Sequence, residues 1–283
     1  MRPETKVHAA RIRRRFADLV GGHSKAIDLA TAALLVAAED EPRIEVDHYL
    51  SQLDRMGEIG RQHVRAASGR AVEAFNRFFF EEQGFLGNEQ HYYDPRNSFL
   101  SDVLDRRRGI PITLSIVYIE VGRRAGLYAE GVGLPGHFIV RAREENSVDS
   151  ALVDPFFGKM IDRNDCQTRL DQVFGGQVEL IDEHLRASTT KDILVRLLTN
   201  LKAIYTRAKL YRQALSAVDR ILILLPDALS EHRDRGALLA QLGRLPEAIA
   251  ATQRYVQLAA NTEDLEQVRE QLHLLQRRWA MLN

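Results

Sequence analysis

The sequence predicts an α+β protein, with a helical N-terminal part, a small antiparallel sheet in the middle and helical hairpins at the C-terminal end. Apolar residues follow helical spacing before residue 84 and after residue 190. Short apolar runs bounded by turn formers lie between these two regions. The C-terminal region also repeats itself. We therefore expect one domain over residues 1–187 and a second over residues 188–283.

Length, charge and cysteine content limit the classes of protein to which the chain can belong. Of 283 residues, 45% are apolar and 28% are charged, which is a globular composition. The 39 basic and 39 acidic side chains cancel, so no nucleic-acid partner is expected, and the basic run at 11–15 reads as a solvated helix face. Cys166, the single cysteine, fits a reducing compartment. With no signal peptide and no apolar stretch long enough for a bilayer, we expect a cytoplasmic protein without a membrane partner.

The first 84 residues are expected to form helices. One follows Ser24 as its N-cap and is stopped by the Glu-Pro pair at residues 41–42. A second begins near Val46, and a third covers about residues 61–83. The third carries four phenylalanines that we assign to the core: Phe75, Phe78, Phe79 and Phe80.

The middle of the chain is predicted to combine an ordered loop, a helix and short strands. Turn formers and aromatic residues alternate over residues 85–100, which indicates an ordered loop. Pro111 suits the first position of a helix that ends at Gly126. Three later pieces read as strands: Ala129–Gly133, Phe138–Arg143 and Ala151–Asp154. Residues 155–187 have a mixed pattern that predicts no single element.

The C-terminal region repeats with a period typical of one family of helical hairpins. YRQAL at residues 211–215 returns as LPEAI at 245–249, and Ala214 and Ala248 are 34 positions apart. That is the period of the tetratricopeptide repeat, in which small residues let two antiparallel helices approach closely. We expect two repeats and a capping helix, and either peptide binding or a bracing role. The signature positions are Leu201, Tyr205, Ala214, Pro226, Gly236 and Ala248.

One stretch of the sequence could carry chemistry. His137 stands where a Pro-Gly turn enters a predicted strand, and Asp154 ends the next strand. Adjacent antiparallel strands would place both side chains together, and an aspartate that orients an imidazole is half of a nucleophile–base–orienter triad. The helix start near Pro111 is where a thiolate would be stabilised by the helix dipole. The alternative is a buried histidine that Asp154 satisfies without any chemistry.

This order resembles the papain-like transglutaminase core. In that core a glycine, one further residue and the catalytic cysteine open a helix, and a histidine and an aspartate follow on successive strands. Gly109 stands in the place of the leading glycine and Gly126 in the place of the glycine that ends the helix. The resemblance implies that His137 and Asp154 are the matching histidine and aspartate.

The position that the resemblance assigns to the nucleophile holds no cysteine. It is occupied by Pro111, or by Ile110 if the count slips by one, and neither side chain is nucleophilic. Thr113 and Ser115 lie inside the predicted helix, and a hydroxyl needs a stronger base than a thiol does. Cys166 reads as an incidental thiol. The resemblance therefore implies a degenerate core, and we lean against enzyme activity without excluding it.

The whole chain resembles, more specifically, a bacterial family that joins a transglutaminase-like core to C-terminal tetratricopeptide repeats, often labelled SirB or invasion-regulator-like. The motifs that carry this resemblance are GNEQHYYDPRNSFLSDVLDRRRGIPITLS, GLPGHFIVR and DPFFG. They imply a regulator whose reaction, if any, is not settled.

Several polar and aromatic side chains are candidates for a binding cleft beside the predicted helix start: Tyr92, Tyr93, Asp94, Asn97, Ser98, Arg108, Pro111, Thr113 and His137. The alternative for residues 92–98 is a turn with local hydrogen bonds. Arg106, Arg107 and Arg108 could meet an anion, although a solvated basic turn is favoured. His91, His137 and Asp154 lack the spacing of a metal site, and no phosphate-binding loop occurs, so neither a metal nor another cofactor is expected.

Three hypotheses for function remain open. The preferred one is a non-catalytic binding or regulatory protein, with a peptide or small ligand at His137 and a protein partner at the repeats. The second is a hydrolase or transferase of unusual mechanism, in which His137 activates water, Asp154 orients His137 and the helix N-terminus stabilises an oxyanion. The third is a scaffold in which the site is inert and the repeats alone contact a partner.

Overall fold

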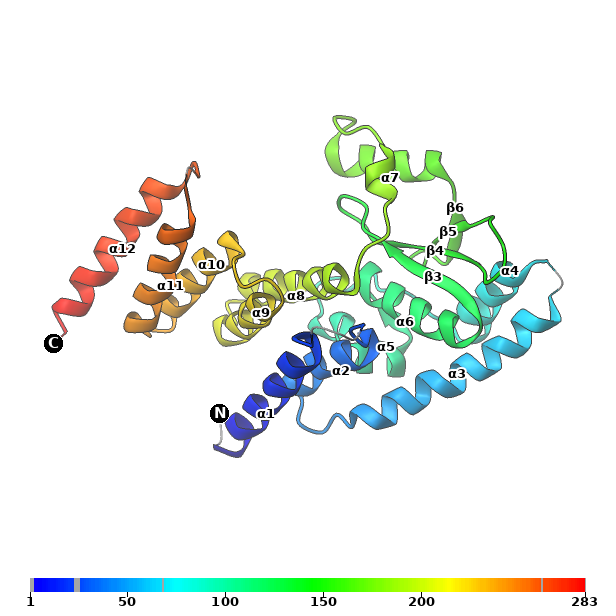
Figure 1. The fold of residues 1–283 in the computed structure, drawn as a ribbon, viewed down its shortest axis with the longest axis horizontal. Coiled ribbons are helices and arrows are strands. Elements are labelled where there is room, and N and C mark those ends of the chain that lie inside the picture. Colours follow the sequence, from blue (N-terminus) through cyan, green and yellow to red (C-terminus); the bar gives the residue numbers. More distant parts are fainter. Residues whose placement is uncertain (1–2, 23–25, 68, 261, 283) are drawn as a thin grey trace. The chain divides into compact units, whose positions relative to one another are not determined.

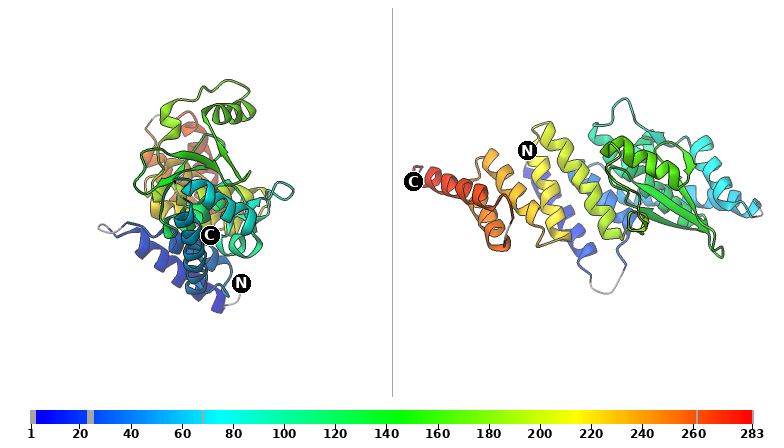
Figure 2. Two further views of the ribbon diagram at one scale, coloured as in Figure 1. Left: turned by 90° about the vertical axis from the view of Figure 1, so that its right-hand side faces the viewer. Right: turned by 90° about the horizontal axis from the view of Figure 1, so that it is seen from above.

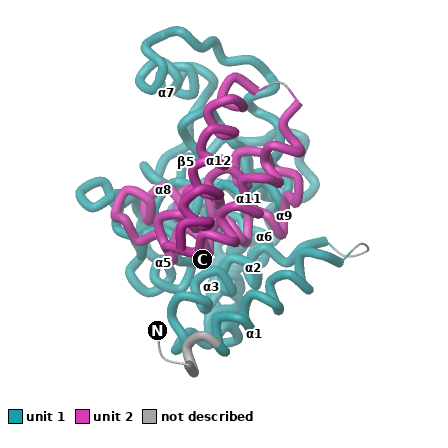
Figure 3. The backbone as a smooth tube through the Cα atoms, turned by 90° about the vertical axis from the view of Figure 1, so that its left-hand side faces the viewer, with its two compact units in different colours: residues 1–197 teal, residues 198–283 magenta. Residues whose placement is uncertain are grey.

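The computed structural model describes residues 3–22, 26–67, 69–260 and 262–282. The chain divides into two compact units, Met1–Leu197 and Leu198–Asn283, drawn in teal and magenta in Figure 3. The first unit combines helices with a four-stranded antiparallel sheet, and the second is helical in its described residues. The α+β class that the sequence predicts is therefore confirmed. The predicted domain boundary at 187/188 lies ten residues before the division into units.

Helices form the N-terminal part of the first unit, as expected (Figure 1). They are α1 (Pro3–Val20), α2 (Leu29–Asp40), α3 (Val46–Ala66), α4 (Ala71–Asn76) and the π-helical turn η1 (Arg77–Glu82). Ser24 lies outside the described residues, and Asp28 caps α2 by accepting a hydrogen bond from the backbone N–H of Thr31 at 2.7 Å. The basic run at 11–15 is only partly a solvated face, because Ile12 is buried and Arg13 pairs with Glu39 of α2.

The boundary predicted at residue 61 is wrong. Helix α3 continues to Ala66, and the aromatic segment begins anew with α4 at Ala71. Gly69 between them adopts the left-handed conformation, with φ of +72°, which ends one helix and separates the next. Three of the four predicted core phenylalanines are fully buried, while Phe80 is half-buried.

The sheet of the first unit has the order β3-β4-β5-β6. Its strands are β3 (Leu127–Val132), β4 (Ile139–Glu144), β5 (Ala151–Asp154) and β6 (Lys159–Ile161). Helix α6 (Pro111–Arg124) packs against β3 and β4 and is buried from Pro111 to Gly122, so it forms the centre of the unit. Figure 2 gives two further views of the sheet and the helices beside it. The three predicted strands are confirmed within about two residues, and β6 was not predicted.

A short connected region leads into α6. It consists of β1 (Leu86–Gly87), η2 (Pro95–Ser98), α5 (Leu100–Arg106) and β2 (Arg108–Gly109). Strands β1 and β2 pair in parallel, with Leu86 opposite Arg108. This pairing holds the start of the loop next to the residues that precede α6. The expectation of an ordered loop over residues 85–100 is thus confirmed, with short elements inside it.

Helix α7 (Arg163–Phe174) fills the region for which the sequence predicted no single element. Asp162 caps it by accepting from the backbone N–H of Asp165 at 2.9 Å. Its two buried residues, Cys166 and Leu170, join a cluster with Val132, Ile139 and Ile161 of the sheet. The short helix η3 (Asp182–Leu185) follows. Helix α7 is therefore held on the sheet by a narrow apolar stripe.

The helical hairpins of the repeat region have the predicted period. They are built from α8 (Thr190–Arg207), α9 (Tyr211–Leu224), α10 (Leu229–Gln241), α11 (Leu245–Leu258) and α12 (Leu265–Ala280). Helices α9 and α11 start and end 34 residues apart, at 211 and 245 and at 224 and 258. Lys209 and Gly243 both have positive φ, 57° and 71°, at equivalent turns. Within the described ranges, no helix is both long and apolar enough to cross a membrane.

Candidate functional site

His137 and Asp154 meet beside the end of the sheet. Strands β4 and β5 are antiparallel with Val140 opposite Val153, so the residues just before β4 lie next to the end of β5. Nε2 of His137 lies 2.8 Å from Oδ2 of Asp154. The backbone N–H of His137 donates to the carbonyl of Leu134 at 3.0 Å, which closes the turn that presents the imidazole. The geometric expectation drawn from the strand order is therefore met.

Asp154 is fully buried, and four donors converge on its carboxylate. Oδ1 accepts from the backbone N–H groups of Phe156 and Phe157 at 3.0 and 3.3 Å. Oδ2 accepts from His137 and lies 2.6 Å from Nη2 of Arg169 on α7. A buried carboxylate is tolerated when it is paired and hydrogen-bonded, and this one is both.

Arg169 belongs to the site although the sequence pattern did not single it out. Its guanidinium carbon lies 4.4 Å from the centre of the Phe157 ring, a cation–π arrangement. Its side chain is 15% exposed, and Nε is buried without a hydrogen-bond partner among the described residues. The guanidinium is thus held between the carboxylate of Asp154 and the aromatic ring.

Cys166 lies one helical turn before Arg169 and is fully buried in the apolar cluster of α7. Burial raises the pKa of its thiol, while the charge of Arg169 lowers it by a smaller amount. A buried thiol with a raised pKa is inert as a nucleophile. This environment supports the interpretation of Cys166 as an incidental thiol, which the fold places in the core.

The start of α6 is tightly packed. Ile110 is 1% exposed, and Pro111 at the first helical position is buried. Oγ1 of Thr113 accepts from the backbone N–H of Ile110 at 3.1 Å and lies 2.6 Å from the carbonyl of Asn97, to which it donates. Ser115 is fully buried, and its hydroxyl has no hydrogen-bond partner among the described residues. Residues 110–115 therefore present no exposed nucleophile.

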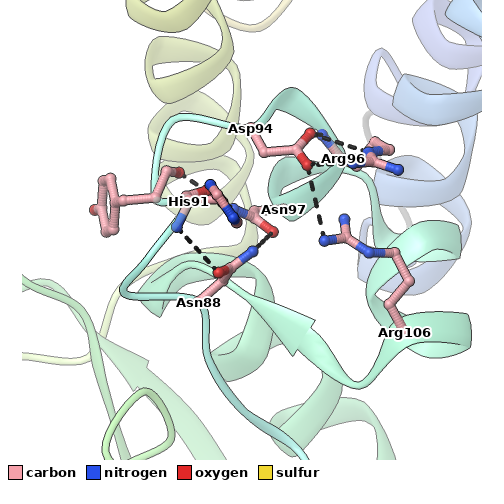
Figure 4. A network of polar contacts seen from close by, with 7 residues as sticks. Asn88, His91, Asp94, Arg96, Asn97 and Arg106 are labelled. Carbon is pink, nitrogen blue, oxygen red and sulfur yellow. Dashed lines mark hydrogen bonds and ion pairs between the residues drawn. The ribbon is translucent and has the colours of Figure 1, made fainter.

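Asn97 organises the loop before α5, as Figure 4 shows. Its side-chain oxygen accepts from Nδ2 of Asn88 at 3.0 Å, and its Nδ2 donates to the carbonyl of His91 at 2.7 Å. The side-chain oxygen of Asn88 in turn accepts from the backbone N–H of His91 at 3.2 Å. Because Asn97 also accepts from Thr113, it ties the loop to the start of α6.

Comparison with known protein families assigns the first unit. The family model of the transglutaminase-like superfamily matches residues 47–199, which include α6, the His137–Asp154 pair and α7. The chain belongs to the transglutaminase-like superfamily. A tetratricopeptide-repeat model matches residues 201–273 of the second unit. No solved structure matches the chain.

Similar proteins occur in bacteria and in animals. A UPF0162 protein of Xylella fastidiosa (strain Temecula1) is 34% identical over 252 residues, which cover 87% of this chain and 89% of that protein. A UPF0162 protein of Vibrio cholerae is 31% identical over 253 residues, covering 88% and 93% of the two chains. F-box only protein 21 of Homo sapiens is 27% identical over 193 residues, covering 63% of this chain but only 29% of that protein.

An aromatic surface adjoins His137 in this transglutaminase-like unit. The imidazole packs against Phe156 and Phe157, with ring centres 6.4 and 6.2 Å apart, and Phe156 contacts Tyr92 at 6.0 Å. Tyr93 follows Tyr92 and is 58% exposed, while Phe157 is 40% exposed. Burial raises the pKa of Tyr92. Phe156 is buried and connects the imidazole to the exposed rings of Tyr92, Tyr93 and Phe157, which we name the aromatic surface.

Other predicted cleft residues have structural partners elsewhere. The side chain of Arg96 donates to Asp94 and is the main cause of the lowered pKa of that carboxyl group. Arg106 lies 3.8 Å from Asp94 (Figure 4). Arg108 donates to the carbonyl of Gly84 at 2.8 Å. Arg107 packs its guanidinium on Phe85 at 4.6 Å. Arg106, Arg107 and Arg108 therefore contact earlier parts of the chain, and only Arg108 of the three is exposed, so the expectation of a solvated basic turn is only partly confirmed.

The contacts within the site therefore join only some of the predicted residues. His137 connects to Asp154 directly, and to Tyr92 and Tyr93 through Phe156. Two further predicted residues, Asn97 and Thr113, are fully buried and act as supports. Phe156 and Phe157 follow Asp154 directly in the DPFFG motif, so that motif could have indicated them. Within the described part of the chain, no cluster of histidine, cysteine and acidic side chains could hold a metal ion.

Proposed function

We propose that this protein is a non-catalytic binding protein with a regulatory role. The His137 site of the transglutaminase-like unit holds a peptide or small ligand, and the tetratricopeptide hairpins contact a protein partner. The finer assignments follow the same reasoning: a SirB-like regulator, located in the cytoplasm, without a nucleic-acid partner. The repeats support a protein partner, because such hairpins expose a continuous surface when they stack.

One observation carries the proposal. The His137–Asp154 pair is intact and lies beside the aromatic surface, whereas the helix start that would supply a nucleophile holds the buried residues Ile110 and Pro111. Thr113 is engaged in structural hydrogen bonds. An oriented imidazole next to exposed rings can recognise a ligand without attacking it, because binding needs only a hydrogen bond and apolar contact.

A hydrolase remains the second candidate because of Nδ1 of His137, which could act as a base. Within the described residues, Nδ1 of His137 makes no hydrogen bond, and an imidazole whose other nitrogen is held by a carboxylate is suited to take a proton from water. Under this candidate, water replaces the missing thiol and Asp154 orients the base. The third candidate, a scaffold with an inert site, assigns all binding to the repeats.

The experiment uses His137→Ala in the full chain, with His48→Ala as the matched control. His48 is an exposed histidine on α3, outside the site. Immobilised wild type, each variant and a fragment of residues 1–207 are used to capture partners from a lysate of the source cell, and each captured protein is then purified for measurement of its Kd.

A partner that binds His48→Ala and the fragment as tightly as wild type, but is lost with His137→Ala, supports a binding role for the site. A partner lost only from the fragment supports the scaffold. Hydrolysis of peptide or ester substrates that depends on His137 would contradict the non-catalytic proposal. Both variants are checked for unchanged unfolding temperature, so that loss of binding is not confused with loss of fold.

A further inference from the structure

Asp154 has two basic neighbours rather than one, His137 and Arg169. In an ordinary aspartate–histidine pair, the carboxylate stabilises the imidazolium that forms when the base takes a proton. Here Arg169 lies 2.6 Å from the oxygen atom that His137 also contacts. Because a guanidinium is always protonated, it already balances the charge of the carboxylate.

A second proton on His137 would leave an unbalanced positive charge. The imidazole is 11% exposed and Arg169 is 15% exposed, so water screens both side chains poorly. The imidazole packs on Phe156 and Phe157, whose rings carry no charge. The carboxylates of Asp162 and Asp165 at the start of α7 accept hydrogen bonds from backbone N–H groups there. The nearby Cys166 thiol has its pKa raised by burial and is neutral.

We propose that Arg169 is a positioning residue that keeps His137 neutral, with Nε2–H donating to Asp154 and Nδ1 exposed as a hydrogen-bond acceptor, so that the site selects ligands with a neutral N–H or O–H donor over anions. An amide N–H next to an apolar or aromatic group fits this chemistry, because the donor reaches Nδ1 while the apolar group covers the aromatic surface. A carboxylate or phosphate has only acceptor oxygens, and their lone pairs would repel the lone pair of Nδ1. This ligand class rests on the proposed binding role of His137.

The first test reads the protonation state of the imidazole and needs no ligand. Full-length protein labelled with ¹⁵N in its histidines is studied by NMR at pH 7.5, and the His137 signals are identified by their loss in His137→Gln. Wild type is expected to show one protonated and one bare ring nitrogen, with the hydrogen on Nε2. Arg169→Gln leaves His137 as the only cation beside Asp154, so both ring nitrogens are expected to become protonated.

Two further variants serve as controls. Arg169→Lys keeps the charge and is expected to keep the wild-type signals. Arg163→Gln changes an exposed arginine on the same helix, whose partner is Asp182, and is expected to change nothing at His137. An imidazolium in wild type, or identical signals in wild type and Arg169→Gln, would overturn the role of Arg169. If Arg169→Gln does not fold, the proposal can still be overturned, because an imidazolium in wild type or in Arg169→Lys contradicts it.

The second test addresses the ligand class with a matched pair of probes. Phenylacetamide and phenylacetate share an aromatic ring, but phenylacetamide carries an amide N–H donor and phenylacetate only a carboxylate. The amide is expected to shift the His137 signals at about fivefold lower concentration, the effect of one hydrogen bond. A preference for the carboxylate, or no shift with either probe, would overturn the ligand class. The NMR test of Arg169 needs no ligand, so its result does not depend on the probe titration or on the capture of partners.

Discussion

Asn97 shows how a single side chain can fix a loop next to the candidate site. It is fully buried, and its amide group joins three parts of the loop, while its carbonyl accepts from Thr113 at the start of α6. The nearby residues Tyr92 and Tyr93 have no regular secondary structure of their own and are exposed. Their position relative to His137 therefore depends on Asn97.

Replacing Asn97 with alanine is expected to lower the free energy of unfolding by about 1–3 kcal/mol, because buried hydrogen-bonding groups lose their partner. Backbone amides of residues 88–96 should then exchange with solvent faster, as measured by hydrogen exchange. Ser98→Ala is the matched control, since the Ser98 hydroxyl is buried without a partner among the described residues. Equal stability of the two variants would show that Asn97 does not hold the loop.

At this scale, sequence could predict one contact and not another. His137 and Asp154 flank two apolar runs separated by a short polar segment, and antiparallel pairing brings such residues together. Arg169 could not be found in this way, because α7 buries only Cys166 and Leu170 and so has a weak helical pattern. Asn97 was a cleft candidate, with a locally hydrogen-bonded turn as the favoured alternative, and its buried hydrogen bonds to Asn88 and His91 fit the turn.

Among the elements, the repeat helices were the most predictable. The period of 34 residues reappears in the ends of α9 and α11, because each hairpin needs the same close approach of two helices. The boundary between α3 and α4 was less predictable, because apolar spacing continues across the turn at Gly69. Strand β6 is only three residues long, too short for a detectable alternation.

The close approach of α10 and α11 can be tested at Gly236. A Cβ atom at this position would overlap with Oγ1 of Thr252. Gly236→Ala is therefore expected to destabilise the second unit by about 1–3 kcal/mol, more than the helix gains from alanine. In a Thr252→Ala background, the same change should be neutral or stabilising. Urea unfolding followed by the fluorescence of Trp279, the single tryptophan, measures both; equal costs in the two backgrounds would contradict the contact.

The start of α12 predicts a dependence on pH. Asp264 accepts from the Tyr255 hydroxyl and from Arg233, and these contacts lower its pKa to about 2. Because the folded value lies below the unfolded value of about 4, the carboxylate stabilises the unit above pH 4 and loses this effect as the pH falls toward 2. Asp264→Asn should therefore flatten the loss of stability between pH 4 and pH 2, again followed by Trp279. An unchanged slope would contradict this role.

At the scale of the whole molecule, helix α8 contributes residues to both units, because the division between the units falls inside it, after Leu197. Its N-terminal half belongs to the transglutaminase-like unit. Two residues before α8, the backbone N–H of Ser188 donates to the carbonyl of Gly131 at 2.8 Å, and Ile193 of α8 lies close against the same glycine. A fragment that ends at residue 187 loses these contacts with β3.

A fragment of residues 1–187 is thus expected to unfold at a temperature at least about 5 °C lower than a fragment of residues 1–207, because it lacks the buried side chains of the first turns of α8. Thermal unfolding followed by circular dichroism measures the difference. Ile193→Ala in the longer fragment should lower the unfolding temperature by part of the same amount. Identical unfolding temperatures would show that the first unit is complete at residue 187.

The buried thiol of Cys166 can be used to measure local opening of the structure around α7. Cys166 is the single cysteine of the chain, and it lies in the cluster that holds α7 on the sheet. A thiol reagent can reach it only when α7 moves away, and the same movement separates Arg169 from Asp154. The rate of labelling under native conditions therefore measures the free energy of that opening. A ligand that binds beside His137 should slow the labelling, which detects binding without any knowledge of what the ligand does.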